Sequence, residues 1–281
     1  MPTVDRARIA QYRADYPRLA LALGKPGAMP APGEVEFLSE MTARDWRGIG
    51  MLPPEDFLFA AAVTSILAPP SAIEVGTASG FSAAIITKMM ALREAEKGGL
   101  EKSPLLHTID KRADFAPDPT KPIGFAIDLL AAELRERIVL HPLHDSSFCR
   151  ELPPDPALRF AFIDGNHRHP WPLLDVLRVL ERMASGWILV HDIDLPATIA
   201  RARAEGRVID LQPVAGAKHV FDLWPDEKVS SGNIGVVKVP ADRTSLGKLI
   251  ASLRQLPSEV SPGSWTKRWR EIDLLGGLLS A

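Results

Sequence analysis

Short apolar runs alternate with helical segments through most of the chain, and this alternation limits the possible folds more than any other feature. The apolar runs predict strands at 72–75, 105–109, 138–140, 159–163 and 187–190. The segments between and after them predict helices at 82–97, 122–135, 172–183 and 197–205. This alternation is typical of a parallel sheet covered by helices on both faces. We therefore predict an α/β fold with a doubly wound, Rossmann-like sheet.

The two ends of the chain show a different pattern. Helical spacing at 4–23, which we expect Pro17 to break, and at 34–42 predicts a helical cap before the sheet, followed by a helix at 53–67. Late strands are predicted at 208–214 and 234–239, separated by a long loop rather than a helix, and the last of the sheet strands is expected to be antiparallel. The expected domains are a cap and linker at 1–52, a ligand-binding domain at 53–240 and a helical tail at 241–281.

Composition excludes several classes of protein. Of 281 residues, 46% are hydrophobic and 24% are charged, so the chain can bury a core and wholesale disorder is excluded. The formal net charge of −2 leaves no basic excess for binding nucleic acid or an anionic membrane. Cys149 is the only cysteine, which excludes an intrachain disulfide and thiolate-rich metal sites. No apolar run is long enough to span a membrane and the N-terminus lacks the apolar core of a signal peptide, so we expect a cytoplasmic protein.

The first predicted strand runs directly into a turn that contains two glycines, in the sequence AIEVGTASGFS. Glycines let the backbone turn tightly and approach a ligand, and the following helix presents its N-terminus there. The turn is not the dinucleotide motif G-x-G-x-x-G, and Glu74 just before Gly76 would repel a pyrophosphate. The alternative is an ordinary strand-to-helix turn.

Polar residues also follow the second and third predicted strands. Asp110 closes the second strand, where a carboxylate can accept hydrogen bonds from both hydroxyls of a ribose. Asp145 and Ser146 follow the third strand, where an adenine edge would pass. Each has a structural alternative, because such residues also cap strands and form Asx or Ser turns.

The fourth and fifth strands end in FIDGNHRHPW and WILVHDID. Neighbouring strands would bring Asp164, His191 and Asp192 to one edge of the sheet, where they could hold a divalent cation. A histidine ligand suits a transition metal better than magnesium. His167 lies three residues after Asp164 and could act as a general base near neutral pH. Taken singly, each histidine could equally be structural, and His169 could contact substrate or lie at the surface.

In order along the chain, EVGTASG, Asp110, HDSS, FIDGNH and VHDI resemble class I S-adenosylmethionine-dependent methyltransferases. Within that class they resemble the small-molecule O-methyltransferase-like group whose fourth strand ends in I-D-G-D-H. The resemblance covers approximately 53–240, and the late strand around 235–237 fits the antiparallel ending of that fold. Two departures remove negative charge: Asn166 replaces an acid of the motif, and His191 stands where metal-dependent members commonly have an acid.

The resemblance implies S-adenosylmethionine as the methyl donor and a small-molecule acceptor. It places Gly76, Thr77 and Gly80 around the methionine part, with Glu74 supporting their loop, Asp110 at the ribose, and Asp145 and Ser146 beside the adenine. The full set of expected cofactor-binding residues is Glu74, Gly76, Thr77, Ser79, Gly80, Asp110, Asp145, Ser146 and Asp164. The resemblance further implies His167 as the general base, and Mg2+ or another divalent cation held by Asp164, His191 and Asp192.

Other functions stay open at this point. The loss of two acids also fits a regulatory protein that binds the cofactor without chemistry, and a nicotinamide-dependent oxidoreductase is disfavoured by the missing glycine motif.

The acceptor pocket is expected from 34–52, 166–171 and 216–233, whose aromatic residues could equally be packing. The tail, with Trp265, Trp269 and 274–279, could mediate a homodimer or pack as a terminal helix.

Overall fold

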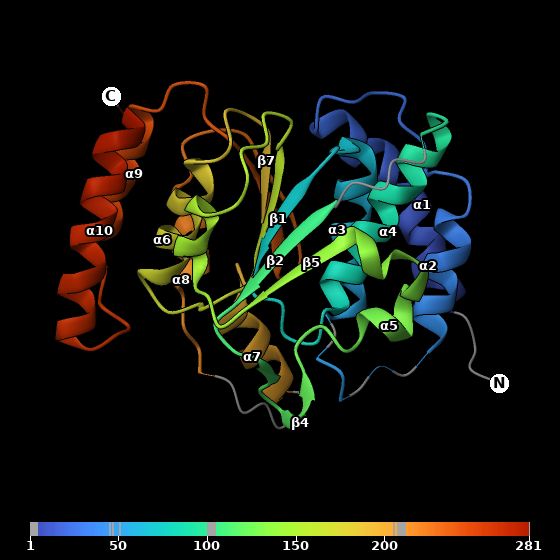
Figure 1. Ribbon diagram of the computed structural model, residues 1–281, viewed down its shortest axis with the longest axis horizontal. Coiled ribbons are helices and arrows are strands. Elements are labelled where there is room, and N and C mark those ends of the chain that lie inside the picture. The colour runs from blue at the N-terminus through green and yellow to red at the C-terminus, as the bar shows by residue number, and fades with distance from the viewer. Residues whose placement is uncertain are drawn as a thin grey trace. The chain divides into compact units, whose positions relative to one another are not determined.

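The computed structural model describes residues 5–44, 46, 48–50, 52–99, 105–204, 206 and 212–280. The chain divides into two units, Met1–His144 and Asp145–Ala281. The boundary falls inside the segment 53–240 that the sequence predicts as one domain. Seven strands form the main sheet, in which β1–β2, β2–β5 and β6–β7 pair in parallel, and β9 (Ile234–Lys238) is antiparallel to both β7 and β8 (Figure 1). This is the mostly parallel, Rossmann-like α/β class predicted from the alternation of strands and helices.

The first unit holds three parallel strands in the order β5-β2-β1. They are β1 (Ala72–Val75), β2 (Leu106–Asp110) and β5 (Ile138–Pro142). The register pairs Val75 with Ile109, and Asp110 with Pro142, so the carboxyl ends of β1 and β2 lie together. All four residues of β1 are buried, which explains why every residue of the strand except Glu74 is apolar.

Four long helices of the first unit are α1 (Arg6–Ala22), α2 (Glu34–Ala43), α3 (Pro54–Leu67) and α4 (Phe81–Glu96). α3 is apolar on every side, so it lies in the interior and packs against both α1 and α4. The α1–α2 region is joined to α3 through the fully buried Glu34, which accepts hydrogen bonds from Tyr12 Oη, Ser65 Oγ and the backbone of Ala31. These partners satisfy a carboxylate that burial would otherwise disfavour.

Two predictions in this unit are wrong. Pro17 does not break the first helix, because the burial of Tyr12, Tyr16 and Leu19 along one side of α1 outweighs the one hydrogen bond that proline removes. The predicted helix at 122–135 is instead the end of β4 (Asp118–Pro122), which pairs with β3 (Asp114–Phe115), then α5 (Ile127–Leu130) and a 3-10 helix (Ala132–Arg137). Gly124 has a left-handed φ of +73°, and Ala131 has an extended φ of −152°, so neither can continue an α-helix.

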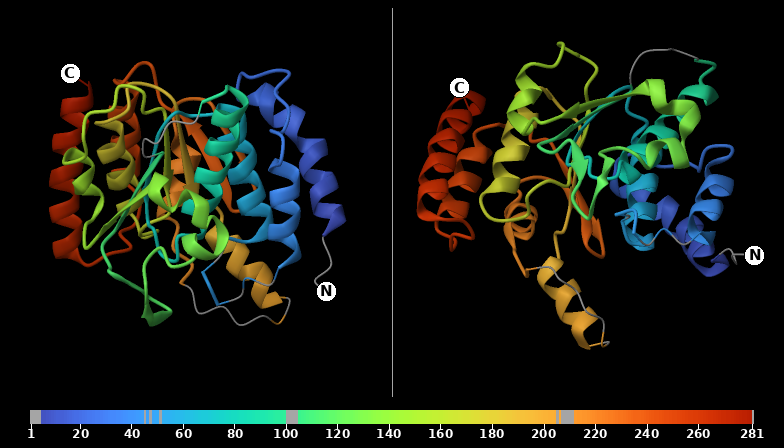
Figure 2. Two further views of the ribbon diagram at one scale, coloured as in Figure 1. Left: turned by 45° about the vertical axis from the view of Figure 1, so that its right-hand side comes forward. Right: turned by 60° about the horizontal axis from the view of Figure 1, so that its bottom comes forward.

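The second unit holds β6 (Phe160–Ile163) parallel to β7 (Trp187–His191), with β9 antiparallel to β7 and β8 (Lys228–Ser231) antiparallel to β9. Its helices are η2 (Ser146–Arg150, a 3-10 helix), α6 (Trp171–Leu180), α7 (Leu195–Ala204), α8 (Gly216–Leu223), α9 (Ser245–Arg254) and α10 (Pro262–Ser280). α6 contacts η2, α8 and α10, and α9 and α10 run side by side (Figures 1 and 2). The two tail helices are therefore an integral part of this unit.

The long loop predicted before 234–239 is also wrong, because α8 and β8 lie there. The buried residues of α8 include Ala217, Val220 and Phe221, which stand at helical spacing on one face. Of the late strand predicted at 208–214, residues 208–211 lie outside the described residues, and 212–214 are not in a strand. Among the described residues, no helix is long and apolar enough to cross a membrane.

Candidate functional site

In the first unit, the turn between β1 and α4 depends on left-handed backbone conformations. Gly76 has a φ of +104° and Gly80 a φ of +84°, and a Cβ at Gly80 would lie 2.8 Å from the Cα of Gly124. A side chain at Gly80 would therefore suffer both backbone strain and a clash. The glycines allow the chain to leave β1 and enter α4 within five residues.

Glu74 lies beneath this turn and is fully buried. Its carboxylate accepts hydrogen bonds from Ser82 Oγ, at 2.6 Å, and from Thr108 Oγ1. The Thr108 hydroxyl also lies 2.7 Å from that of Thr77. Glu74 thus ties the end of β1 to β2 and to the first turn of α4, and these contacts fix the shape of the turn.

Asp110, at the end of β2, faces the same turn. Its two carboxylate oxygens accept hydrogen bonds from the backbone N–H groups of Ala78 and Arg112, each at 2.9 Å. A carboxylate oxygen accepts more than one hydrogen bond, so this geometry leaves capacity for two hydroxyl donors of a ligand. Ser79 is nearly fully buried, and its Oγ lies 3.3 Å from the backbone nitrogen of Phe81, where it accepts a hydrogen bond at the start of α4.

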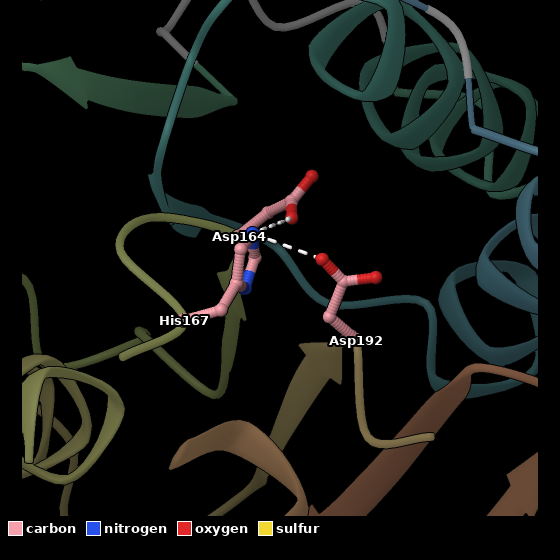
Figure 3. A group of neighbouring side chains, drawn as sticks. All are labelled: Asp164, His167 and Asp192. Atoms are coloured by element: carbon pink, nitrogen blue, oxygen red, sulfur yellow. Dashed lines mark ion pairs between the residues drawn. The ribbon is translucent and has the colours of Figure 1, made fainter. Parts of the chain in front are cut away.

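In the second unit, Asp164, His167 and Asp192 form one cluster at the ends of β6 and β7 (Figure 3). Nε2 of His167 lies 3.0 Å from Oδ2 of Asp192 and 3.7 Å from Oδ1 of Asp164. A carboxylate only accepts hydrogen bonds, so the tautomer of His167 that pairs with Asp192 carries its proton on Nε2 and its lone pair on Nδ1. The His167 side chain is 26% exposed, so an external molecule can reach it.

His191, the last residue of β7, adds a second imidazole. Its Nδ1 lies 3.0 Å from Oδ1 of Asp164 and 3.6 Å from Oδ1 of Asp192. Asp192 has a left-handed φ of +61°, a conformation that a non-glycine residue adopts only when its surroundings hold it there. The structure therefore brings His167 together with all three residues that the resemblance implies as cation ligands.

Asn233 holds Asp192 in place, and the sequence interpretation missed it. Its Nδ2 donates to Oδ1 of Asp192 at 2.5 Å, and its Oδ1 accepts from the backbone of Asp194 at 2.8 Å. The backbone carbonyl of Asn233 also accepts from Ile193. The only local signal is the turn SGN before β9, which does not reveal a partner 41 residues away.

The donor set at this edge is mixed, with two carboxylates and two imidazoles. One ligand atom from each of Asp164, His167 and Asp192 falls within 4.8 Å of the others, which is close enough for a shared cation. Mixed nitrogen and oxygen ligands suit first-row transition metals, whereas Mg2+ prefers oxygen. A neutral imidazole that bound a cation through Nε2 would carry its proton on Nδ1, so His167 cannot be both a ligand and a general base.

Ser146 and Asp145 begin the second unit and contact α6. The Ser146 hydroxyl is buried, donates to Oδ1 of Asp175 and accepts from Nη1 of Arg178 at 2.7 Å. Asp145 is half-exposed, with Nη1 of Arg178 at 3.4 Å. Burial alone would raise the pKa of Asp145, but hydrogen bonds from Ser147 and the charge of Arg178 outweigh it and lower that pKa. Thus the Asp145 carboxylate stays accessible, whereas the Ser146 hydroxyl is engaged within the unit.

Replacing Asp175 should change how stability depends on pH. Burial raises the pKa of this carboxyl to about 6, against the opposing effects of Ser146 and Arg178. The folded-state pKa of Asp175 is above the unfolded value of roughly 3.9. The neutral carboxyl therefore makes its full contribution to the free energy of unfolding below about pH 4, and this contribution is lost as the pH rises through about 6. An asparagine does not ionise, so between pH 4 and pH 8 the free energy of unfolding of Asp175→Asn should rise relative to that of the wild type, by up to ~3 kcal/mol.

Urea unfolding between pH 4 and pH 8 measures this difference. The surface replacement Asp222→Asn, in the same unit, is the control and should show no such trend. A constant difference between Asp175→Asn and the wild type across this pH range would contradict the prediction.

Two comparisons with known proteins found similarities to this chain. Residues 73–193 match a family model described as a methyltransferase domain, and this region contains every predicted site residue from Glu74 to Asp192. No curated protein matches the chain.

Solved structures that resemble this chain include three described as O-methyltransferases. One from Bacillus cereus, in complex with SAH, is 14% identical, with 82% of this chain and 99% of that chain covered and a TM-score of 0.45. A putative one from Klebsiella pneumoniae is 14% identical, with 82% and 97% covered and a TM-score of 0.46. TomG from Streptomyces achromogenes, in complex with SAM, is 12% identical, with 81% and 97% covered and a TM-score of 0.44.

Proposed function

We propose that the protein is an S-adenosylmethionine-dependent methyltransferase that methylates a hydroxyl oxygen of a small molecule, with His167 as the general base. The observation that carries this proposal is the His167–Asp192 pair, with Nε2 and Oδ2 3.0 Å apart, inside the region that matches a methyltransferase domain. An accessible imidazole that is paired with a carboxylate has the arrangement of a general base.

S-adenosylmethionine supplies a methyl group already activated by its sulfonium. The chain therefore has two tasks, which are to orient the two molecules and to remove the acceptor proton. The hydroxyl proton passes to Nδ1 of His167, the oxygen forms a bond to the methyl carbon, and the carbon–sulfur bond breaks to leave the neutral thioether S-adenosylhomocysteine. Asp192, on the opposite side of the imidazole, stabilises the positive charge that His167 then carries.

Cofactor binding is proposed for the residues around the turn after β1 and around Asp145. Asp110 would accept hydrogen bonds from the ribose hydroxyls with the capacity that its two backbone contacts leave. The turn at 76–80 would receive the methionine part, with Glu74 acting through its contacts to Ser82 and Thr108. Asp145 and the adjacent Ser146 would border the adenine, for which Asp145 is the half-exposed acceptor.

We further propose that Asp164, His191 and Asp192 hold a divalent cation beside His167. Nδ1 of His191 lies 3.0 and 3.6 Å from the two carboxylates, so the three side chains can converge on one cation. The cation would replace the proton that Nδ1 shares with Asp164 in its absence. A cation bound there would lower the pKa of an acceptor hydroxyl. The nitrogen ligand favours a transition metal over Mg2+.

A second candidate function is a regulatory protein that binds the cofactor without chemistry. It is favoured by Asn166, whose Oδ1 accepts from the backbone of Arg168 at 3.1 Å and so shapes the loop instead of adding charge. Production of S-adenosylhomocysteine from a pool of small hydroxylated acceptors separates this candidate from a methyltransferase.

Asp110→Asn should weaken binding of S-adenosylhomocysteine. The amide keeps the size of the side chain but removes the charge that strengthens hydrogen bonds from a diol, so we expect a loss on the order of 10- to 100-fold in affinity. Isothermal titration calorimetry measures this directly. Asp118→Asn, a change of the same kind in the β3–β4 pair, should bind like the wild type.

The same titration tests the proposed function. Wild-type protein should bind S-adenosylmethionine and S-adenosylhomocysteine, and a nicotinamide dinucleotide should give no heat of binding. If the wild type binds neither sulfur nucleoside, the proposed function is wrong.

A further inference from the structure

The loop that carries His167 is held by the C-terminal segment 241–281, which lies outside the region matched by the methyltransferase model. This loop runs from Asp164 to Pro170, between β6 and α6. Within it, Arg168 contacts Asn166 and Trp171 through backbone hydrogen bonds. These local contacts shape the loop, and contacts with distant residues attach it to the rest of the unit, one of them from Nη2 of Arg168 to Oε1 of Gln212 at 3.2 Å.

His169 provides one attachment. It is fully buried, and its Nε2 lies 2.9 Å from the backbone carbonyl of Leu253 in α9. A carbonyl only accepts hydrogen bonds, so Nε2 carries the proton. Burial lowers the pKa of His169 to about 4, so the ring is neutral at pH 7. Its edge-to-face contacts with Trp265 and Trp269 of α10 place it in an aromatic cluster, and it is therefore an anchor.

Glu259, between α9 and α10, provides a second attachment through both carboxylate oxygens. Oε2 accepts from the backbone N–H of His169 at 2.6 Å, and Oε1 accepts from that of Ala215 at 2.7 Å. One half-buried carboxylate thus joins the His167 loop to the residue that precedes α8. Hydrogen bonds from N–H groups to a charged acceptor are about twice as strong as neutral ones.

Gly216 shows how closely the two joined segments approach. A Cβ at this position would lie 2.5 Å from the carbonyl oxygen of His167 and 2.5 Å from the backbone nitrogen of His169. The start of α8 therefore packs directly against the backbone on either side of Arg168. The Glu259 bridge and the close packing at Gly216 therefore act on the same short stretch of backbone, which includes His167.

We propose that Glu259 is a positioning residue for His167. It does not touch His167, and it acts by fixing the backbone two residues away, so that Nε2 stays 3.0 Å from Oδ2 of Asp192. The kinetic part of this inference rests on the proposed function, because it assumes that His167 removes the acceptor proton. The structural part stands without it.

The test compares Glu259→Ala, Glu259→Gln and Glu259→Asp in the full chain. Glu259→Ala leaves two backbone N–H groups without their acceptor, so kcat should fall on the order of 10- to 100-fold while KM for S-adenosylmethionine stays within about two-fold. Glu259→Gln keeps one acceptor oxygen and should lie between Ala and the wild type. Glu259→Asp keeps the charge and should recover part of the lost kcat.

NMR at one fixed pH gives a readout that needs no activity. In Glu259→Ala, the His167 ring resonance should shift and broaden, and the amides of His169 and Ala215 should exchange with solvent faster. His167→Gln assigns the ring resonance. Asp242→Ala is the matched control, because Asp242 also accepts a backbone N–H in the C-terminal segment, that of Thr244 at 2.9 Å. This control should change neither kcat nor the His167 resonance.

The outcomes separate the two proposals. An unchanged His167 resonance and unchanged kcat in folded Glu259→Ala and Glu259→Gln would overturn the positioning role. If the His167 resonance shifts in Glu259→Ala and the wild type itself produces no S-adenosylhomocysteine, the positioning role stands and the proposed function is rejected. If Glu259→Ala does not fold, the same comparison is decided on Glu259→Gln and Glu259→Asp.

Discussion

His167→Ala should lower kcat for methyl transfer by roughly 10²- to 10⁴-fold while S-adenosylmethionine still binds. A hydroxyl is a poor nucleophile at pH 7, so its proton must leave as the oxygen attacks. In the tautomer whose Nε2–H faces Asp192, at 3.0 Å, the Nδ1 lone pair of His167 is available for that proton. The affinity for S-adenosylhomocysteine, measured by calorimetry, should change little, because the proposed cofactor contacts do not use this ring.

Chemical rescue sharpens this test. The His167→Ala variant leaves a space the size of the ring, so added imidazole should restore part of the lost rate, and it should have no effect on the wild type. His107→Gln is the control, since His107 pairs with His141 at 3.0 Å within the first unit and has no role in the proposed chemistry. A His167→Ala protein with the full wild-type rate on the same acceptor would show that another group removes the proton.

The fold and the edge that carries the candidate site could be predicted because β6 and β7 are short, largely apolar runs, each followed directly by an aspartate. Phe160–Ile163 is fully buried and is followed by Asp164, and Trp187–His191 is followed by Asp192. In two adjacent parallel strands, the residues that follow the carboxyl ends lie side by side at one edge of the sheet. This is why Asp164 and Asp192 could be paired from the sequence alone.

The residues that could not be predicted are those recruited by contacts distant in sequence. Glu259 reaches a backbone N–H 90 residues away, and Asn233 reaches Asp192 across 41 residues. No local pattern encodes either pairing. Ser146 illustrates the same limit, because its hydroxyl donates to Asp175, which is 29 residues further along the chain.

The segment 122–135 was mispredicted for a different reason. Its helical spacing is real, but Gly124 adopts a left-handed conformation, and a Cβ there would lie 2.9 Å from a methyl carbon of Leu140. The close approach to β5 thus decides the backbone conformation. Tertiary packing overrides a local helical preference at such a position.

Removal of divalent cations should lower the rate of methyl transfer on the order of 100-fold, and Mn2+ should restore it better than Mg2+. The expectation follows from the donor set, in which His191 contributes a nitrogen between the carboxylates of Asp164 and Asp192. The measurement is the rate of S-adenosylhomocysteine formation after treatment with a chelator and after each cation is added back. His191→Asp converts the set to oxygen ligands and should shift the preference toward Mg2+.

Variants of His167 distinguish two possible ligand sets, because His167 lies close enough to Asp164 and Asp192 to share a cation with them. If Asp164, His191 and Asp192 hold the cation, His167→Ala should leave the affinity for Mn2+ unchanged, whereas His191→Ala should lower it at least 10-fold. The opposite result, a loss of Mn2+ affinity in His167→Ala alone, would make His167 a ligand and remove it as the base, since one neutral imidazole cannot do both. A different result would contradict the cation site: full activity after all divalent ions are removed, and no heat of binding from Mn2+ in calorimetry. The two carboxylates would then serve only to orient the two histidines and to stabilise their positive charge.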